Sequence, residues 1–247
     1  MPVAIPNFDY NYIRKGKPIF VPTAIGRRIG NEIKEAVESA YNFDSIYFHL
    51  RRGGHIAAMH HHRDNHSFAR IDISNFFYSI SRRRVQSALD RAGVGNARFY
   101  AQWSTVANPF GDPRYALPYG FVQSPILASL VVATSDIGRH LLALPRSIKV
   151  GVYVDDISFS SDDVLELQQA YDTTLAVISA EGLAVSAAKL RPPAQEIDIF
   201  NCNLTHGMVN VTDDRINAFL SNNPTAEAGN AFDAYCAAVE TGNQFQT

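Results

Sequence analysis

Two adjacent aspartates, Asp155 and Asp156, lie in the segment GVYVDDISFSS between apolar, β-branched flanks. Apolar alternation on both sides predicts two strands joined by a tight bend that carries the two carboxylates. Two carboxylates this close do not both stay ionised without cations, and Mg²⁺ prefers carboxylate oxygens. We therefore expect a divalent metal here, and at least one raised carboxylate pKa in the metal-free protein. A solvated Asp-Asp turn is the alternative for this segment taken alone.

Asp72, in the segment ARIDISNFFYSI, also follows an apolar strand. A third carboxylate of this kind suits two-metal phosphoryl transfer. One metal activates the attacking 3′ oxygen and the other holds the triphosphate and leaving group, with the ions about 4 Å apart. Together the three aspartates predict a catalytic metal site.

Three segments in order resemble motifs A, B and C of reverse transcriptases. They are the strand from Asp72 with Phe76, Phe77 and Ile80, then LPYGFVQSPILASL, then YVDD. Their order and spacing are similar to the bacterial branch, which includes retron, group II intron and phage-defence enzymes. The resemblance runs from about Phe48 to Val211, and three ordered motifs are far more specific than one.

The resemblance implies an RNA-directed DNA polymerase with two Mg²⁺ ions, for which Mn²⁺ can substitute. Its partners would be an RNA template, commonly a noncoding RNA, together with dNTPs and the DNA product. In such bacterial systems the DNA synthesis underlies protection from phage. The implied fold is α+β, a right-hand polymerase palm with an antiparallel sheet, helices on one face, a fingers hairpin and a reduced thumb.

The resemblance also assigns roles to single residues. The metal site would comprise Asp72, Ile73, Asp155 and Asp156, and the three aspartates would be catalytic. Phe77 would stack under the incoming sugar and exclude a 2′-OH. Lys189 would place a cation near the triphosphate. An ordinary core phenylalanine and a solvated loop lysine are the alternatives for these two. The further nucleotide-binding candidates are Gly120, Gln123, Arg51, Arg63 and Arg70, and the template- or primer-binding candidates are Tyr119, Ser124, Pro125, Arg52 and Arg83.

Motif B departs from the family at Tyr119, because most bacterial relatives have Pro-Gln-Gly where this chain has Pro118-Tyr119-Gly120. This departure leaves open a template-independent or protein-primed DNA polymerase on the same fold. An RNA-dependent RNA polymerase is a second alternative, which Phe77 argues against. A non-enzymatic RNA-binding subunit is a third, which the intact acidic set argues against.

Composition favours a globular protein with a substantial core, since 46% of the 247 residues are apolar. Residues 1–100 carry 15 Lys and Arg against 8 Asp and Glu, and residues 101–247 carry 7 against 16. A basic half can hold a polyanion, although solvated faces would give the same balance. No apolar signal segment or membrane span is expected, and the two cysteines show no metal spacing. We therefore predict a cytoplasmic protein.

Histidines gather between His49 and His66, with three in a row at positions 60–62. We do not expect zinc there, because consecutive residues of a strand do not converge on one ion. We expect these histidines to contact RNA, stack on bases or cover a hairpin.

Periodicity and turn signals predict the remaining elements. We expect an N-terminal arm with fingers over 1–67, a palm over 68–203, and a post-palm hairpin with a short helical thumb over 204–247. So short a tail would depend on a bound RNA, an accessory protein or self-association. The expected elements are an irregular arm over 1–25, helices over 26–40, 81–93, 123–144, 163–182, 213–221 and 225–239, and strands over 45–52, 55–63, 68–74, 147–154 and 157–161, with a further hairpin around His206-Gly207.

Overall fold

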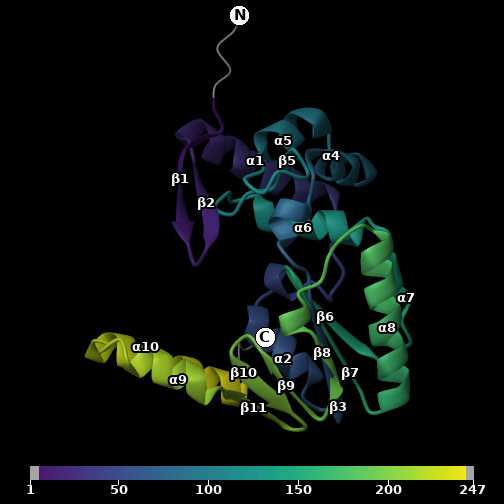
Figure 1. The fold of residues 1–247 in the computed structure, drawn as a ribbon, viewed down its shortest axis with the longest axis vertical. Helices are drawn as coiled ribbons and strands as arrows, with labels where there is room; N and C mark the ends of the chain where they lie inside the picture. The colour runs from purple at the N-terminus through teal and green to yellow at the C-terminus, as the bar shows by residue number, and fades with distance from the viewer. Residues whose placement is uncertain (1–5, 243–247) are drawn as a thin grey trace, which may run out of the picture. The chain divides into compact units, whose positions relative to one another are not determined.

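The structure, a computed structural model, describes residues 6–242 and divides into two compact units with interleaved chain segments (Figure 1). Each unit is described by itself, and the predicted linear division into arm, palm and thumb stays a prediction. The first unit holds the described residues up to Asp44 with Ile73–Leu142 and Val177–Ala184, and the second holds Ser45–Asp72, Ala143–Ala176 and the described residues from Val185 onward.

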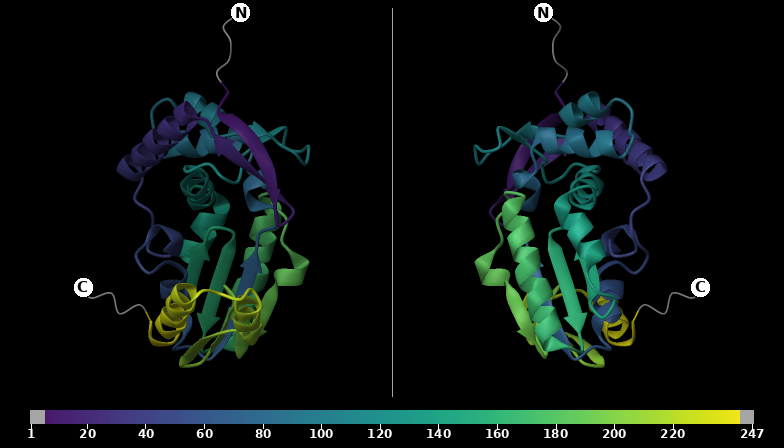
Figure 2. Two further views of the ribbon diagram at one scale, coloured as in Figure 1. Left: turned by 90° about the vertical axis from the view of Figure 1, so that its left-hand side faces the viewer. Right: turned by 90° about the vertical axis from the view of Figure 1, so that its right-hand side faces the viewer.

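The second unit is built on a four-stranded antiparallel sheet of order β6-β7-β3-β8. Every residue of β3 is buried, because the strand is central in the sheet. Helix α8 (Val164–Ala180) lies beside the sheet (Figure 2). The strands are β3 (Ser67–Asp72), β6 (Lys149–Tyr153), β7 (Asp156–Ser161) and β8 (Arg191–Ala194), and the expected strands over 68–74, 147–154 and 157–161 are confirmed.

A second sheet of order β11-β10-β9 completes this unit. The hairpin expected around His206-Gly207 is confirmed as β10 and β11. An apolar core joins this sheet to helices α2 and α10 through Ile56, Phe68, Leu204 and Val239. The elements are η1 (Phe48–Leu50), α2 (Gly54–His62), η2 (Ala187–Lys189), β9 (Glu196–Ile199), β10 (Cys202–Thr205), β11 (Met208–Val211), α9 (Asp213–Leu220) and α10 (Ala226–Thr241).

The first unit is mainly helical. Its helices α1 and α4 begin where side-chain oxygens accept free backbone N–H groups. These oxygens belong to Thr23 and to Ser81, the first residue of the helix expected over 81–93. Its elements are β1 (Phe8–Arg14), β2 (Lys17–Pro22), α1 (Ala24–Ala40), α3 (Phe76–Ser79), α4 (Arg82–Arg91), α5 (Ala97–Trp103), β4 (Val106–Ala107), β5 (Tyr115–Ala116), α6 (Ser124–Ala133) and most of α7 (Asp136–Ala143).

Two expectations about local structure are wrong near the N-terminus. Residues 45–52 and 55–63 form a 3₁₀ turn and helix α2, not a hairpin. Gly53, with φ 87°, begins this helix instead of turning a hairpin, and Ile56 and Met59 bury one helical face. The arm predicted as irregular contains the β1–β2 hairpin, whose bend at Lys15 and Gly16 takes positive φ at both residues, as a tight hairpin requires.

The prediction of one continuous helix over 123–144 is also wrong, because the chain forms two helices, α6 and α7, with a break between them. The Thr134 hydroxyl donates to the Leu130 carbonyl, and the Ser135 hydroxyl accepts the Ile137 N–H and so begins a second helix. Ser124 is the first helical residue and Gln123 precedes it as the cap.

No single helix within residues 6–242 is long and apolar enough to cross a membrane. Helices α6 and α7 pass the same test of length and composition only as a pair, bent by 66° at their break.

His62 is buried in the second unit, so the expectation that this histidine contacts RNA is wrong. Its Nδ1 lies 2.8 Å from the Ser160 hydroxyl and its Nε2 lies 2.9 Å from the Ser158 hydroxyl. Burial lowers the pKa of His62 well below its ordinary value, and nearby His61 and Lys149 lower this pKa further. The side chain is therefore a neutral part of the core at neutral pH.

We expect the free energy of unfolding to decrease as the pH falls below about 6.5. In the unfolded state the His62 side chain binds a proton at this pH, whereas in the folded state its lowered pKa keeps it neutral. The slope contributed by one such group approaches about 1.4 kcal/mol per pH unit. The measurement is denaturant unfolding at several pH values for the wild type and for His62→Gln, whose amide can still bond the serines. The wild type should show the steeper acid loss, and equal slopes would contradict this assignment; His66→Gln, at an exposed position, is the control.

Candidate active site

The register of two strands brings two of the predicted aspartates face to face. Asp72 at the end of β3 is paired with Asp156 at the start of β7, and their side chains are 4% and 13% exposed. Asp155 occupies the bend between β6 and β7. Val154, before it, has φ 61°, which is strained for a β-branched residue. Such strain gathers at functional sites, where the surrounding structure holds it.

Two basic side chains hold these carboxylates. Arg70 Nη2 lies 2.6 Å from Asp156 Oδ1 and 3.9 Å from Asp72 Oδ2. Lys189 Nζ donates to Asp72 Oδ2 at 2.8 Å. Arg70 and Asp72 share one face of β3, since side chains two residues apart on a strand point the same way. The acidic site therefore contains its own counter-charges.

Burial raises the pKa of Asp156 to about 6, against the effect of Arg70, and the neighbouring Asp155 and Asp72 raise this pKa further. The expectation of a raised carboxylate pKa is thereby confirmed. Even with Arg70 in place, the cluster favours additional positive charge, either a proton or a cation.

The donor set suits a divalent ion. Carboxylate oxygens and backbone carbonyls, such as that of Ile73, are ligands that a hard cation like Mg²⁺ prefers. Within the described part of the chain, no three His, Cys, Asp or Glu side chains are arranged to hold a metal as they stand. Asp72 is engaged by Lys189 and Asp156 by Arg70. Ion binding at Asp72 would therefore replace the contact with the exposed Lys189 ammonium, whereas the buried Arg70 would remain on Asp156.

The predicted sugar gate lies in the first unit. Phe77 is 7% exposed, and its ring meets Tyr119 edge to face, with centroids 4.7 Å apart. Lys17, from the N-terminal hairpin, donates to the Tyr119 hydroxyl at 2.9 Å. Tyr119, where the motif departs from the family, therefore supports Phe77 from the side.

Gly120 has a structural reason to be glycine. Its φ is 101°, and a Cβ there would lie 2.2 Å from the Phe20 carbonyl oxygen. The Phe20 N–H donates to the Tyr119 carbonyl at 2.9 Å, which fixes the N-terminal hairpin against this segment. A side chain at Gly120 would push that hairpin away.

The rest of the motif B segment points inward. Gln123 is buried and donates to the Ser104 hydroxyl at 3.4 Å. The buried Ser124 hydroxyl has no hydrogen-bond partner among residues 6–242. Pro125 occupies the first turn of α6. The predicted contacts of these residues with nucleotide or template stay predictions.

The arginine candidates divide into different settings. Arg51 stacks on Phe48 at 5.1 Å, Arg63 pairs with Asp64 at 3.6 Å, and Arg52 is exposed. Arg83 lies on α4 in the first unit. Of the arginine candidates, Arg70 is the one that the structure joins to the aspartates.

Asp198 is a neighbour of this site that the sequence did not single out. Its carbonyl accepts from Arg70 Nη1 at 3.3 Å, and its carboxylate pairs with Arg191. The alternation of β3 could have placed Arg70 beside Asp72. No local pattern indicates Asp198, because its position depends on how strand β9 follows β8.

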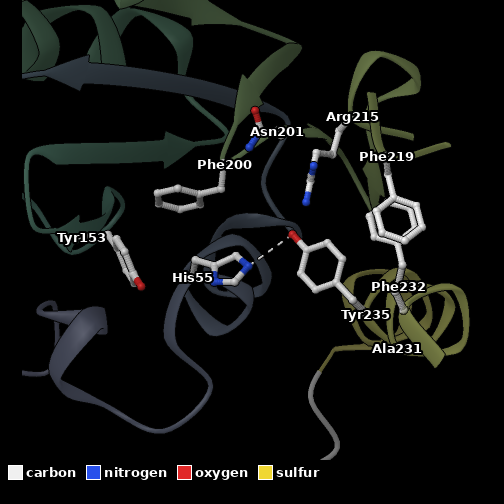
Figure 3. Close-up of a pocket in the computed structure, with 10 residues that line it drawn as sticks. His55, Tyr153, Phe200, Asn201, Arg215, Phe219, Ala231, Phe232 and Tyr235 are labelled. Atoms are coloured by element: carbon white, nitrogen blue, oxygen red, sulfur yellow. Dashed lines mark hydrogen bonds between the residues drawn. The ribbon is translucent and has the colours of Figure 1, made fainter. Parts of the chain in front are cut away.

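An aromatic cavity of about 630 Å³ lies in the same unit as the aspartates (Figure 3). Tyr153, the residue paired with Asp156 across the bend at Asp155, contributes one wall. Phe219 and Phe232 stack with their centroids 4.1 Å apart, and Arg215 lies over the Phe232 ring at 5.5 Å. The cavity thus offers flat apolar faces and one guanidinium beside the YVDD bend.

An antiparallel sheet with paired aspartates at its strand ends and helices around it defines a right-hand polymerase palm. Residues 5–199 match the family described as "Reverse transcriptase (RNA-dependent DNA polymerase)". The chain belongs to this reverse transcriptase family, and the predicted family and fold class are confirmed.

Known proteins are similar to parts of this chain. "Retron Ec86 reverse transcriptase" of Escherichia coli is 26% identical over 119 residues, covering 48% of this chain and 36% of that protein. The chain thus spans about a third of this relative. A foamy viral protease-reverse transcriptase solved with double-stranded DNA superposes with TM-score 0.52 and 18% identity, over 88% of this chain and 32% of that one. A Candida albicans telomerase solved with telomeric RNA gives TM-score 0.48 and 12% identity, over 76% and 37%.

Proposed function

We propose that the protein is an RNA-directed DNA polymerase that extends a DNA strand on an RNA template by two-metal nucleotidyl transfer. The observation that carries this proposal is the pairing of Asp72 with Asp156, beside Asp155, in a chain of the reverse transcriptase family. Bound Mg²⁺ ions would supply charge neutralisation and a more acidic primer 3′ hydroxyl.

The chain's own residues prepare and hold this site. Arg70 is only 10% exposed, so it stays with Asp156 and fixes that side chain. Lys189 is 52% exposed, and its flexible stem lets its ammonium leave Asp72 for the phosphates of an incoming dNTP. The alternative for Lys189, a solvated loop residue, is weakened by its contact with Asp72.

The aromatic cavity supports binding of a nucleic-acid strand near the catalytic bend. Aromatic side chains stack on bases of any sequence, each worth about 1–3 kcal/mol, and arginine adds phosphate binding. Tyr153, Phe232 and Arg215 provide these groups.

The biological setting is the least direct part of the proposal. We propose that the template is a noncoding RNA, that the DNA made serves anti-phage defence in the bacterial cytoplasm, and that an accessory protein or a second copy assists. Support comes from the likeness to a retron reverse transcriptase over 48% of this chain.

Primer extension tests the activity directly. With an RNA template, a DNA primer, dNTPs and Mg²⁺, the protein should lengthen the primer. A chelator should abolish synthesis, because the anionic aspartates repel the reacting phosphates unless metal ions neutralise the charge. Adding back Mg²⁺ or Mn²⁺ should restore it. Primer extension that survives complete chelation would contradict the proposed mechanism. Products on RNA only with UTP and the other ribonucleotides would favour an RNA polymerase instead.

A further inference from the structure

A second cavity, of about 420 Å³, lies in the first unit and is lined by arginines. Arg83, Arg84 and Arg91 come from α4, and Arg139 comes from α7. Two carboxylates, Asp136 and Glu181, also line it. Four positive and two negative side chains leave a surplus of two positive charges in one concavity.

The two carboxylates that line the cavity already contact some of its positive groups. Glu181 Oε1 accepts the Asp136 N–H at the start of α7 at 3.0 Å, and its Oε2 lies 3.7 Å from Arg84 Nη1. Asp136 pairs with Arg139, and both side chains are about two-thirds exposed, so solvent weakens this pair. An internal carboxylate thus already uses the helix start and one guanidinium.

The remaining positive charge is not neutralised. Arg91 Nη1 donates to the Thr134 carbonyl at 2.8 Å, a contact that orients its guanidinium without cancelling its charge. The Arg83 side chain has no hydrogen bond or ion pair within residues 6–242. The Ser87 hydroxyl also lines the cavity, and hydroxyls join arginines in contacts with phosphate.

We propose that this cavity, together with the adjoining face of α4, binds the phosphate backbone of an RNA strand. Arg83 and Arg91 are eight residues apart on one helix, or about 12 Å along its axis. Successive phosphates of one strand would contact both guanidinium groups over that length. Arginine also binds phosphate bidentately, which suits this polymer.

The choice of RNA rests on the proposed function, since an RNA template is the polyanion that such a polymerase must hold. The arginine-lined cavity lies in the first unit, and the three aspartates lie in the second.

The test measures how the affinity for a fluorescein-labelled RNA hairpin depends on salt concentration, using fluorescence anisotropy. In Arg83→Gln/Arg91→Gln, the slope of log affinity against log salt should become less steep by about 1.4 for single strands, or about 1.8 for a duplex. Arg27→Gln/Arg28→Gln, exposed arginines on α1 of the same unit, removes the same charge and should change the slope much less. Circular dichroism melting checks that both variants fold.

A variant of opposite sign completes the test. Glu181→Gln keeps an oxygen that can accept the α7 N–H but removes a competing negative charge, so RNA should bind more tightly and with a steeper slope. Equal slope changes in the two double variants, or an unchanged slope in Arg83→Gln/Arg91→Gln, would overturn the proposal. So would stabilisation by inorganic phosphate without any change in RNA binding, or tighter binding of a DNA hairpin of the same sequence.

The readout also separates this site from the proposed function. Primer extension by the wild-type protein is measured in parallel, and its absence would contradict the polymerase assignment. The difference in salt slope between the two double variants is measured by RNA binding alone, so it does not depend on the outcome of primer extension.

Discussion

Asp155→Asn is expected to reduce primer extension by at least on the order of 10²–10³-fold, the scale for loss of one transition-state charge contact. Asparagine keeps the size of the side chain and removes the anionic oxygen that would bind metal. Asp155 is half-buried at a bend that already carries Val154 in a strained conformation. Its loss should therefore act on the chemistry more than on the fold.

Melting temperature and product formation separate these effects. The variant should melt at or above the wild-type temperature, because one of three neighbouring carboxylates is gone, and it should extend primers poorly at every Mg²⁺ concentration. Asp90→Asn, an exposed residue of α4, is the matched control and should retain activity. Sequencing the nucleic acid that copurifies should find RNA with both proteins but complementary DNA only with the wild type. Unchanged DNA synthesis by Asp155→Asn would overturn the assignment of the catalytic site.

Phe77→Ala is expected to lower the preference for dNTPs over rNTPs by about 10- to 100-fold. Placing the 2′-OH of an rNTP against the packed Phe77 ring would cost about 1–3 kcal/mol. Replacing the ring with a methyl group removes this penalty. Phe77 is also nearly buried, so its truncation will destabilise the unit by about 3–5 kcal/mol. The informative measurement is the ratio of kcat/KM values for dCTP and CTP on one template, because loss of folded protein cancels in a ratio.

Tyr119→Phe is the graded companion of this variant. It keeps the ring against Phe77 and removes the hydroxyl that Lys17 holds, so its preference should fall between those of the wild type and Phe77→Ala. Phe99→Ala, at an exposed position on α5, controls for removal of an aromatic ring. If the dCTP to CTP ratio stays constant while stability falls, Phe77 is an ordinary core residue.

Local rules predicted strands β6 and β7 and the bend at Asp155 because the determinants there are short-range. Alternating apolar residues specify β6 and β7, and the two-residue bend between them fixes where Asp155 points. The same rules failed at residues 45–63, where Gly53 begins a helix although the surrounding residues alternate like a strand. A glycine before an apolar run can either turn a hairpin or begin a helix. At Gly53 the helix is selected by the tertiary packing of Ile56 and Met59.

In the candidate site, too, some residues could be predicted from a local motif, whereas other contacts depend on the tertiary structure. Asp72, Asp155 and Asp156 could be predicted because a motif carries them. The contacts of Arg70 and Lys189 with those aspartates depend on register and on where a distant segment returns, since 117 positions separate Lys189 from Asp72. The inward rotation of Gln123 and Ser124 is equally invisible in sequence, because a helix start can face either way.

The buried guanidinium of Arg70 has a consequence for how the protein would meet its metal. In the proposed mechanism, Lys189 would leave Asp72 so that this carboxylate could hold Mg²⁺, while Arg70 would remain on Asp156. The folded state would then not require bound metal. The free energy of binding each ion would be smaller than the number of carboxylates suggests, because the ion would replace an existing cation. Occupancy would follow the free Mg²⁺ concentration and the arrival of nucleotide, whose phosphates give Lys189 an alternative partner. Such a polymerase would stay assembled but idle until substrate and metal are present together.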